Sequence, residues 1–291
     1  QCFANEYVFS ETEEERAAVE KLEQRIALLA KKGHPVPPAF VVALGTYRPL
    51  YSFSWAQKLS ERKWTDSIKS VFKRQMSEPL EERSLRDQIP CVTSIQNSIS
   101  KSVREQYEEN PYPRWIKTGL AYKSRPLASV LRGSPLCFDL GDYVSPEHPE
   151  ILVAGCGTGQ HVLNTASRFS NARVLAVDLS LNSLSYALRK TNELGFSNIE
   201  YVQGDILELG KLKRQFDLIE CAGVLHHLGD PLAGWRILVG LLRPGGIMKI
   251  SLYSEIARQD ILRGRSLIAE KGYTTSPEDI RRCRQDFITM A

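Results

Sequence analysis

Several features are scarce in this sequence of 291 residues, and each scarcity excludes a class of protein. No apolar run approaches the roughly 18 residues that cross a membrane as a helix; the clean runs are as short as Ala39–Leu44. The opening residues lack the succession of basic, apolar and small residues that is typical of a secretory signal. Proline (15 residues) and glycine (19 residues) are too few for a low-complexity chain. We therefore expect a globular protein with no membrane partner.

Cysteine and charge exclude further classes. The six cysteines form no Cys-x-x-Cys pair, so the spacing of a zinc site is missing and no metal is expected. Their scatter argues against a disulfide framework and favours a reducing, cytoplasmic setting. The net charge of +4 is spread along the chain. Because nucleic acids bind to concentrated basic surfaces, we expect no nucleic-acid partner.

Helical patterns fill the first 110 residues, which we interpret as an N-terminal helical domain (1–110). Thr12–Glu15 has the pattern of a capping box, and apolar residues recur at helical spacing over Val19–Leu29. Residues 111–150 are rich in proline, glycine and aromatic residues, and they predict a connector that also serves as a lid. Residues 254–291 predict two further helices.

Residues 151–253 have a different texture, because short apolar runs of strand length alternate there with helical patterns. Such runs are typical of strands buried on both faces, and their alternation with helices predicts a doubly wound, mostly parallel α/β sheet. The strand-like runs are 151–154, 173–177, 199–202, 216–220 and 247–252. The predicted fold class is therefore α/β with an all-helical N-terminal domain.

A glycine-rich turn follows the first of these runs directly. Residues 155–160 read Gly-Cys-Gly-Thr-Gly-Gln and open a helix, whose free N-terminal amides can face a ligand. The spacing is GxGxG, whereas nicotinamide-binding folds prefer GxGxxG. Asp178 ends the second strand, where a carboxylate can bind two ribose hydroxyls, and Asp205 follows the third strand, where it can accept from an adenine amino group.

Five motifs follow one another in this region: AGCGTG (154–159), VDLS (177–180), GDI (204–206), FDLIECAGVLHHL (216–228) and LLRPGG (241–246). In this order they resemble the motifs of class I S-adenosylmethionine-dependent methyltransferases. The resemblance implies a Rossmann-like domain over 151–253 that takes S-adenosyl-L-methionine as cofactor and releases S-adenosyl-L-homocysteine.

The resemblance also implies roles for individual residues. Gly155, Gly157 and Gly159 are expected beneath the amino-acid part of the cofactor. Asp178 is expected at the ribose, and Asp205 with Ile206 at the adenine. The other residues expected to bind the cofactor are Cys156, Thr158, Gln160, Leu179, Cys221 and Arg114. Arg243–Gly246 is expected to be the turn before the fifth strand.

The chain departs from the family pattern at two points. An Asp or Glu often stands two residues before the first motif glycine, and Val153 stands there in this sequence. Sheets of this family have seven strands, the last two antiparallel, whereas only five strand-like runs are found and residues 255–291 have helical patterns. We therefore expect the last two strands to be missing and the chain to be cut before them. The fifth strand would then expose an edge that the 255–291 helices or a second copy of the chain covers, so a homodimer is possible.

The upstream segment has a narrower resemblance. Tyr47-Arg48-Pro49-Leu50-Tyr51, the stretch from Arg74-Gln75 to Pro79, and the segment from Gln106 to Trp115 are similar to the methyltransferase portion of bacterial tetratricopeptide-repeat proteins. That resemblance implies that this chain lacks the repeats, and it implies no acceptor.

Three side chains are candidates for catalysis. His226 and His227 follow the fourth strand, and either could act as a general base near neutral pH. Alternatively, His227 caps or packs a helix and His226 shapes the pocket. Tyr112 belongs with Tyr107, Arg114 and Trp115 to an aromatic cluster that either covers the cofactor or docks the helical region onto the sheet. Arg114 could pair with a carboxylate of the cofactor or of a substrate.

The sequence therefore predicts an S-adenosylmethionine-dependent methyltransferase acting on a small-molecule or protein acceptor. A non-catalytic module that binds the cofactor is the alternative, because Val153 departs from the pattern and no base is obvious. A nicotinamide oxidoreductase would share the sheet but would require the other glycine spacing. A DNA methyltransferase is disfavoured, because Asn110-Pro111-Tyr112-Pro113 precedes the glycine turn, whereas the similar signature of that class follows the fourth strand.

Overall fold

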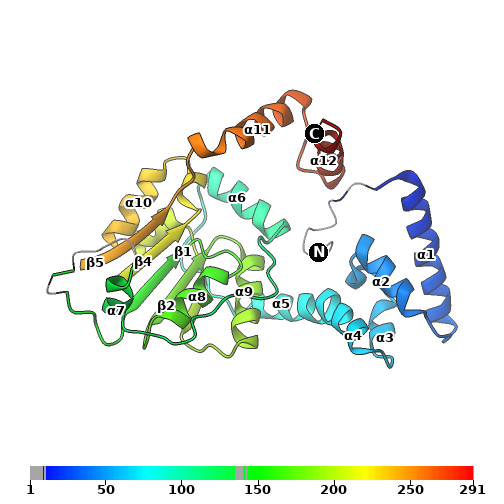
Figure 1. Cartoon of the computed structure of the whole chain (residues 1–291), viewed down its shortest axis with the longest axis horizontal. Coiled ribbons are helices and arrows are strands. Elements are labelled where there is room, and N and C mark those ends of the chain that lie inside the picture. Colours follow the sequence, from blue (N-terminus) through cyan, green and yellow to red (C-terminus); the bar gives the residue numbers. More distant parts are fainter. Residues whose placement is uncertain (1–8, 10, 135–139, 142, 291) are drawn as a thin grey trace. The chain divides into compact units, whose positions relative to one another are not determined.

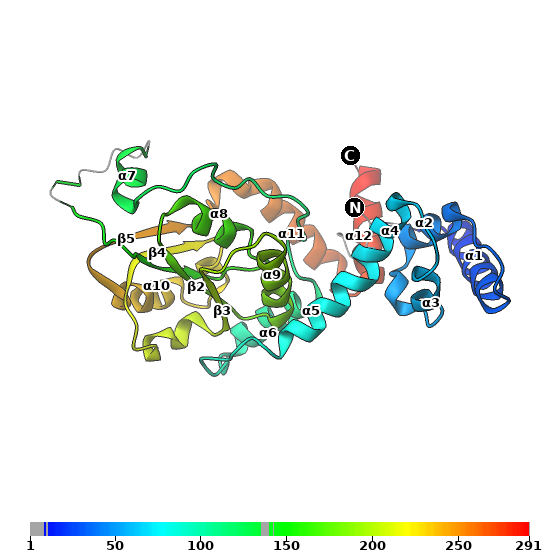
Figure 2. The ribbon, with the colours of Figure 1, turned by 90° about the horizontal axis from the view of Figure 1, so that it is seen from below.

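The computed structural model of the chain describes residues 9, 11–134, 140, 141 and 143–290 (Figures 1 and 2). Contacts divide the chain into two compact units, one formed by residues 1–81 with 255–291 and the other by residues 82–254. This division groups residues 82–110 with the sheet and residues 255–291 with the N-terminal helices, which differs from the domain boundaries expected from the sequence.

Neither a membrane span nor a disulfide occurs in the part of the chain that the structure describes. None of its helices is long and apolar enough to cross a bilayer. Cys91, Cys156, Cys221 and Cys283 are free thiols, and Cys2 and Cys137 lie outside the described residues.

The first unit is helical, as predicted. Its helices are α1 (Glu13–Lys31), α2 (Pro38–Tyr47), α3 (Ala56–Ser60), α4 (Asp66–Phe72) with a π-helical turn at Lys73–Ser77, the first part of α5 (Glu78–Arg86), α11 (Gln259–Lys271) and α12 (Pro277–Met290). The predicted capping box is confirmed: the Glu15 amide donates to Thr12 Oγ1 at 3.1 Å and the Thr12 amide to Glu15 Oε2 at 2.8 Å. Ile26 from the middle of α1 is fully buried against Leu44 and Leu59, so the amphipathic face of this helix makes the core.

The second unit contains a sheet of five parallel strands in the order β3-β2-β1-β4-β5. The strands are β1 (Glu150–Ala154), β2 (Arg173–Asp178), β3 (Ile199–Gln203), β4 (Phe216–Ala222) and β5 (Leu242–Ser251). The helices are α6 (Ser98–Glu109), α7 (Leu127–Arg132), α8 (Gln160–Arg168), α9 (Leu181–Glu193) and α10 (Pro231–Gly240). This confirms the predicted α/β fold, a Rossmann-like sheet with a helical N-terminal region.

Alternate residues of the central strands enter two separate cores. Ile151 and Val153 face one core, which includes Val162 of α8 and Leu184 of α9. Leu152 and Ala154 face the other, which includes Leu238 and Leu241 at the end of α10. Because successive strand side chains point to opposite faces, α8 and α9 cover one face of the sheet and α10 the other (Figure 2). Burial on both faces explains why these strands read as continuous apolar runs.

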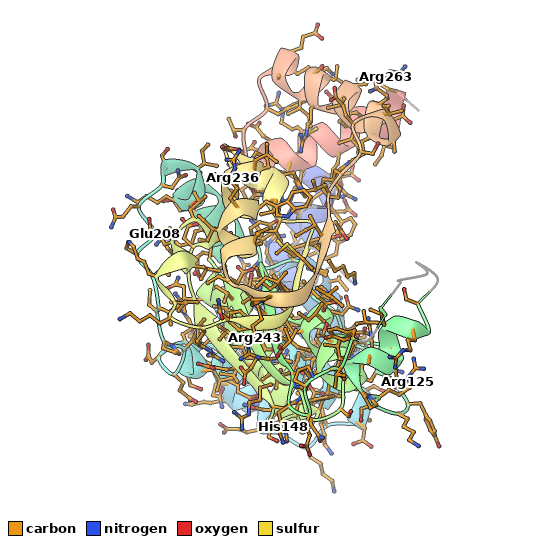
Figure 3. The ribbon with its side chains drawn as sticks, turned by 90° about the vertical axis from the view of Figure 1, so that its left-hand side faces the viewer. Arg125, His148, Glu208, Arg236, Arg243 and Arg263 are labelled. Atoms are coloured by element: carbon orange, nitrogen blue, oxygen red, sulfur yellow. The ribbon has the colours of Figure 1, made fainter. Side chains whose placement is uncertain are left out.

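The fifth strand differs from its prediction. Residues 243–246 were expected to form a turn before β5, but they belong to the strand and interrupt its pairing with β4. Phe216 pairs with Leu242, whereas Leu218, two residues later in β4, pairs with Ile247. Gly245 has φ +77°, which lets the chain bend there. Arg243, labelled in Figure 3, bonds to the Asp217 carboxylate at 2.6 Å and fastens this segment to β4.

The two edges of the described sheet differ. Along β3, Gln203 donates its amide to the Pro90 carbonyl at 2.8 Å and accepts from the Val92 amide at 2.9 Å, so a segment before α6 covers the end of that strand. β5 is the other edge strand among the described residues. Pairing of its outer edge with a second copy of the chain stays a prediction.

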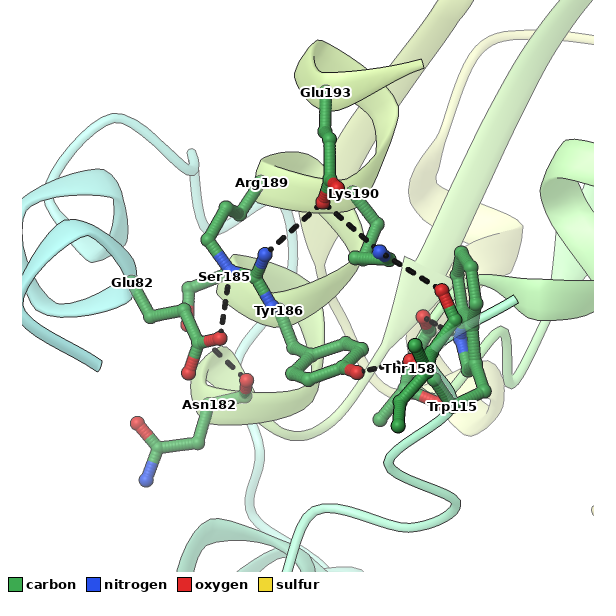
Figure 4. Close-up of polar contacts among 10 residues, drawn as sticks. Glu82, Trp115, Thr158, Asn182, Ser185, Tyr186, Arg189, Lys190 and Glu193 are labelled. Atoms are coloured by element: carbon green, nitrogen blue, oxygen red, sulfur yellow. Dashed lines mark hydrogen bonds and ion pairs between the residues drawn. The ribbon is translucent and has the colours of Figure 1, made fainter. Parts of the chain in front are cut away.

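Trp115 anchors the segment before β1 to α9 (Figure 4). Its Nε1 donates to the Thr158 carbonyl at 3.0 Å, and the Tyr186 hydroxyl donates to the Trp115 carbonyl. The two rings meet edge to face at 6.2 Å, and Lys190 Nζ lies 4.9 Å from the indole centroid. Trp115 is only 7% exposed, so the lid role predicted for it does not fit its place in the core.

Replacing Trp115 with phenylalanine tests this anchoring role. The Trp115→Phe variant keeps a ring beside Tyr186 but loses the indole N–H that bonds to Thr158. We expect the free energy of unfolding to fall by about 1–2 kcal/mol, as for one hydrogen bond and part of an aromatic contact. Urea unfolding followed by circular dichroism measures the change, and an unchanged midpoint would contradict the anchor.

Candidate functional site

A cavity of about 460 Å³ opens at the carboxyl ends of β1, β2, β4 and β5. Its floor is the turn after β1, and further walls come from α6 and from Tyr112 and Pro113. All lining residues belong to the unit of residues 82–254. Parallel α/β sheets bind their ligands at this edge, so the cavity lies where the sequence predicted a site.

The three motif glycines are required by the conformation of the turn. Gly155, Gly157 and Gly159 have φ values of +73°, +51° and +81°, which residues with a Cβ rarely adopt. A Cβ at Gly155 would lie 2.3 Å from Val224 Cγ2, and one at Gly159 would lie 2.6 Å from Ala187 Cβ. At Gly157 the nearest atom would be the Tyr112 carbonyl oxygen, 3.6 Å away. Gly157 therefore keeps cavity space open, whereas the other two glycines allow close packing.

Asp178 ties the end of β2 to the glycine turn. Its Oδ2 accepts from the Gly157 amide at 2.7 Å, and its Oδ1 accepts from the Ser180 amide at 3.0 Å. Burial raises the pKa of this carboxyl, and the amides of Ser180 and Gly157 offset part of the rise. The carboxylate lines the cavity, and each of its oxygens has a second lone pair for a ligand hydroxyl.

Asp205 is held by the backbone and has one oxygen without a protein partner. Its amide donates to Thr93 Oγ1 at 2.8 Å, and its Oδ1 accepts from the Leu207 amide at 3.0 Å. Oδ2 has no hydrogen-bond partner among the described residues, and the same holds for Oγ of Ser100 on α6. Both side chains are 1% exposed, and both residues line the cavity. Buried polar atoms are rarely left unpaired, so these two atoms fit a polar ligand such as an adenine ring.

Helix α6 is fixed over the cavity through its last turn. The Leu181 amide, at the start of α9, donates to Glu108 Oε1 at 2.6 Å. The Ser180 hydroxyl donates to the Tyr107 carbonyl at 3.0 Å. These bonds hold the Tyr107 ring at the cavity, where burial, with Asp178 and Tyr253 nearby, raises the pKa of its phenol.

The two predicted histidines differ in their contacts with the cavity. His227 lines the cavity and meets the Tyr107 ring edge to face at 6.3 Å. His226 packs between the His227 ring, 4.3 Å away, and the Tyr253 ring, 4.0 Å away. His227 is therefore the histidine placed to meet a ligand, and His226 packs against its ring.

The structure brings most of the predicted site residues together. The predicted residues that line the cavity are Tyr112, Gly155, Cys156, Gly157, Thr158, Gln160, Asp178, Leu179, Asp205, Ile206 and His227. Gly159, Arg114, Cys221 and His226 are outside the described lining. Burial raises the pKa of the Cys221 thiol to about 12 and that of Cys156 well above its usual value, so both thiols are neutral.

Sequence reasoning missed several lining residues. They are Ser100 and Val103 on α6, His161 on α8, and Lys249 and Ser251 on β5. A signal was present for two of them: His161 directly follows the glycine-rich turn, and Lys249 interrupts an apolar strand. A cation in such a run requires a partner or solvent, which hints at a polar site.

The partner of both His161 and Lys249 is Glu220 on β4. This carboxylate is buried, with 2% of its side chain exposed; its Oε2 lies 3.1 Å from His161 Nε2 and its Oε1 lies 3.5 Å from Lys249 Nζ. The Thr165 hydroxyl donates to Oε2. Burial acts to raise the pKa of Glu220, but the contacts of His161, Thr165 and Lys249 outweigh it and lower the pKa to about 2.

The lowered pKa of Glu220 predicts how stability depends on pH. The ionised carboxylate stabilises the fold fully above its usual pKa of 4.5, and this contribution is lost as the pH falls toward 2. We expect Glu220→Gln to lower the free energy of unfolding by about 2 kcal/mol at pH 7, since the side chains of Lys249 and His161 are partly exposed. Denaturant titrations of both proteins at pH 7, 4 and 3 measure the difference, which should shrink at the lower values. A difference that grows on acidification would contradict the pairing.

Comparisons with known proteins agree with this geometry. Residues 151–246 match the family model described as a methyltransferase domain. An uncharacterised protein of Synechococcus is 38% identical over 122 residues, which are 42% of this chain and 29% of that one. The trans-aconitate 2-methyltransferase of Deinococcus radiodurans is 35% identical over 112 residues, 37% of this chain and 40% of the enzyme. The chain thus spans less than half the length of these two relatives.

Two solved structures are also similar to part of the chain. An S-adenosylmethionine-dependent methyltransferase from Clostridium acetobutylicum is 26% identical, with 40% of this chain and 47% of that one covered and a TM-score of 0.36. PKMT2 from Rickettsia typhi, in complex with AdoHcy, is 26% identical, with 49% of this chain and 29% of that one covered and a TM-score of 0.40. The resemblance of the upstream segment to tetratricopeptide-repeat proteins stays a prediction. Residues 151–246 are therefore similar in sequence to methyltransferase domains.

Proposed function

We propose that this chain binds S-adenosyl-L-methionine in the cavity and transfers its methyl group to an acceptor that enters from the side of β4 and β5. The observation that carries the proposal is the arrangement of the glycine turn, Asp178 and Asp205 around one cavity within a methyltransferase domain. The orphaned Asp205 Oδ2 and the open space at Gly157 are the features that fit this cofactor.

Each part of the cofactor has its own residues in this proposal. Asp178 accepts from the ribose hydroxyls, Asp205 and Ser100 bond to the adenine, and the turn at Gly155 and Gly157 lets the amino-acid part lie close to the backbone. The cofactor supplies an activated methyl group on its sulfonium. Because that group is already activated, the protein contributes mainly by holding the acceptor in line with it.

The acceptor side is proposed to be the wall formed by Tyr107, Tyr112, His227 and Tyr253. His227 is the group placed to take a proton from an acceptor that is a weak nucleophile. The matching relatives include a trans-aconitate 2-methyltransferase and a malonyl-[acyl-carrier protein] O-methyltransferase, so both a small molecule and a protein are acceptors worth testing.

Methyl transfer from tritiated S-adenosyl-L-methionine tests the function. The purified 291-residue chain is incubated with a bacterial lysate split into protein, small-molecule and nucleic-acid fractions. We expect label in the protein or small-molecule fraction, and far less when Gly157→Ala replaces the parent chain at a cofactor concentration below saturation. Binding of the cofactor without transfer to any fraction would instead favour a non-catalytic cofactor-binding module.

A further inference from the structure

Glu220 and its partners form a charged cluster to which the proposed cofactor contacts assign no role. Burying a carboxylate is costly unless it is paired, and Glu220 is paired with His161, Thr165 and Lys249. His161 and Lys249 line the cavity, whereas Glu220 is outside the described lining. The cluster therefore belongs to the wall of the site.

The sheet register relates this cluster to the missing acidic residue at Val153. Val153 on β1 pairs directly with Glu220 on β4, in neighbouring parallel strands. The carboxylate thus stands at the level of Val153 but one strand closer to β5. Val153 stands two residues before the glycine turn, and Glu220, its neighbour on β4, contacts Lys249 and His161 at the cavity wall.

The chemistry of that wall favours an anion. A lysine ammonium has three N–H donors, and Glu220 engages one of them. A second basic group, His161, contacts the other oxygen of the same carboxylate. Asp178 and Asp205 supply acceptors to the cavity, whereas Lys249 supplies N–H donors that suit a carboxylate, and the His161 ring lines the same cavity.

We propose that Lys249 and His161, positioned by Glu220, form a carboxylate-binding subsite in the cavity. The inference deepens the proposed function and rests on it for the source of the ligand. The carboxylate belongs either to the amino-acid end of the cofactor or to the methyl acceptor, and the chemistry of recognition is the same in both cases.

Binding calorimetry on the 291-residue chain tests the subsite with Lys249→Met. The ligands are S-adenosylhomocysteine and 5′-methylthioadenosine, which keeps the adenosine and the thioether but lacks the amino-acid end. If the subsite holds the cofactor, the variant loses roughly tenfold in affinity for S-adenosylhomocysteine, as for a charged hydrogen bond, and binds methylthioadenosine like the parent. If it holds the acceptor, both affinities are unchanged, and succinate binds to the parent loaded with S-adenosylhomocysteine but not to the variant.

Two further variants separate the subsite from general effects of charge and folding. Lys211→Met removes another paired lysine, one that bonds to Glu208 on the surface, and it should change none of these affinities. Lys249→Arg keeps a cation beside Glu220 and should restore most of the binding. Unchanged affinity of Lys249→Met for S-adenosylhomocysteine, together with no Lys249-dependent succinate binding, would overturn the proposal.

The positioning role of Glu220 has its own readout. Glu220→Gln should lower the affinity for the same carboxylate ligand as Lys249→Met and leave the affinity for methylthioadenosine unchanged. A loosened fold would lower both affinities. Combined with Lys249→Met, it should add little, because the two changes act on one interaction. A parent chain that binds neither nucleoside ligand would contradict the proposed function, whereas the difference between the two ligands tests the subsite.

Discussion

Gly157→Ala is expected to weaken the binding of S-adenosylhomocysteine by roughly 100-fold while leaving the sheet folded. A Cβ at this position meets only the Tyr112 carbonyl oxygen, at 3.6 Å, so it extends into cavity space that the proposed cofactor fills. The backbone at Gly157, with φ +51°, also donates its amide to Asp178. The new methyl group would therefore occupy the place of the proposed ligand, next to the Asp178 carboxylate.

Gly195→Ala is the matched control for this change. Gly195 follows α9, has φ +74°, and would place its Cβ more than 4 Å from every described residue other than its two chain neighbours. Both variants place an alanine in the left-handed region, at a cost of about 1–2 kcal/mol in stability. Calorimetry should show normal affinity for Gly195→Ala. Equal affinities of the two variants would show that Gly157 serves the fold alone.

The strands and most of the glycine site could be predicted because their signals are local. A central parallel strand is buried on both faces, so the sequences of β1 and β2 are continuous apolar runs. The turn after β1 requires glycines at positive φ, and Asp178 stands at the end of its strand. Each of these features leaves a signal within a few consecutive residues of the sequence.

The cluster at Glu220 could not be predicted, because it depends on the register of distant strands. His161, Glu220 and Lys249 come from α8, β4 and β5, and only the pairing of β4 with β1 and with β5 brings them to one wall. Ser100 was missed for the same reason, since its helix reaches the cavity through bonds between Glu108 and the start of α9.

The aromatic residues before β1 have two different roles in the fold, although they form one cluster in the sequence. Tyr112 is 71% exposed and lines the cavity, whereas Trp115, three residues later, is buried against Tyr186. The sequence offered a lid or a docking surface as alternatives for this cluster. Trp115 docks the segment on α9, and this anchor leaves Tyr112 at the mouth of the cavity, where a ligand can meet it.

Asp178→Ala is expected to weaken S-adenosylhomocysteine binding by about 2–3 kcal/mol, or roughly 30- to 150-fold, as for hydrogen bonds to a charged group. The carboxylate lines the cavity and already holds the Gly157 and Ser180 amides. Asp178→Ala also removes the bond to the Gly157 amide and so loosens the glycine turn. The test therefore compares two ligands that differ only in the ribose hydroxyls. Adenosine and 2′,3′-dideoxyadenosine differ only in those hydroxyls. The parent should prefer adenosine, and the variant should lose that preference.

Asp217→Ala is the matched control for Asp178→Ala, because Asp217 is also a strand aspartate that accepts a backbone amide. It bonds to the Glu150 amide at 2.8 Å and to Arg243, at the opposite end of the strands from the cavity. We expect this variant to lose stability but to keep the affinity and the preference for adenosine, as measured by competition calorimetry. If Asp178→Ala folds and still prefers adenosine over the dideoxy compound, Asp178 does not bind the ribose. The adenosine end would then have to lie elsewhere in the cavity.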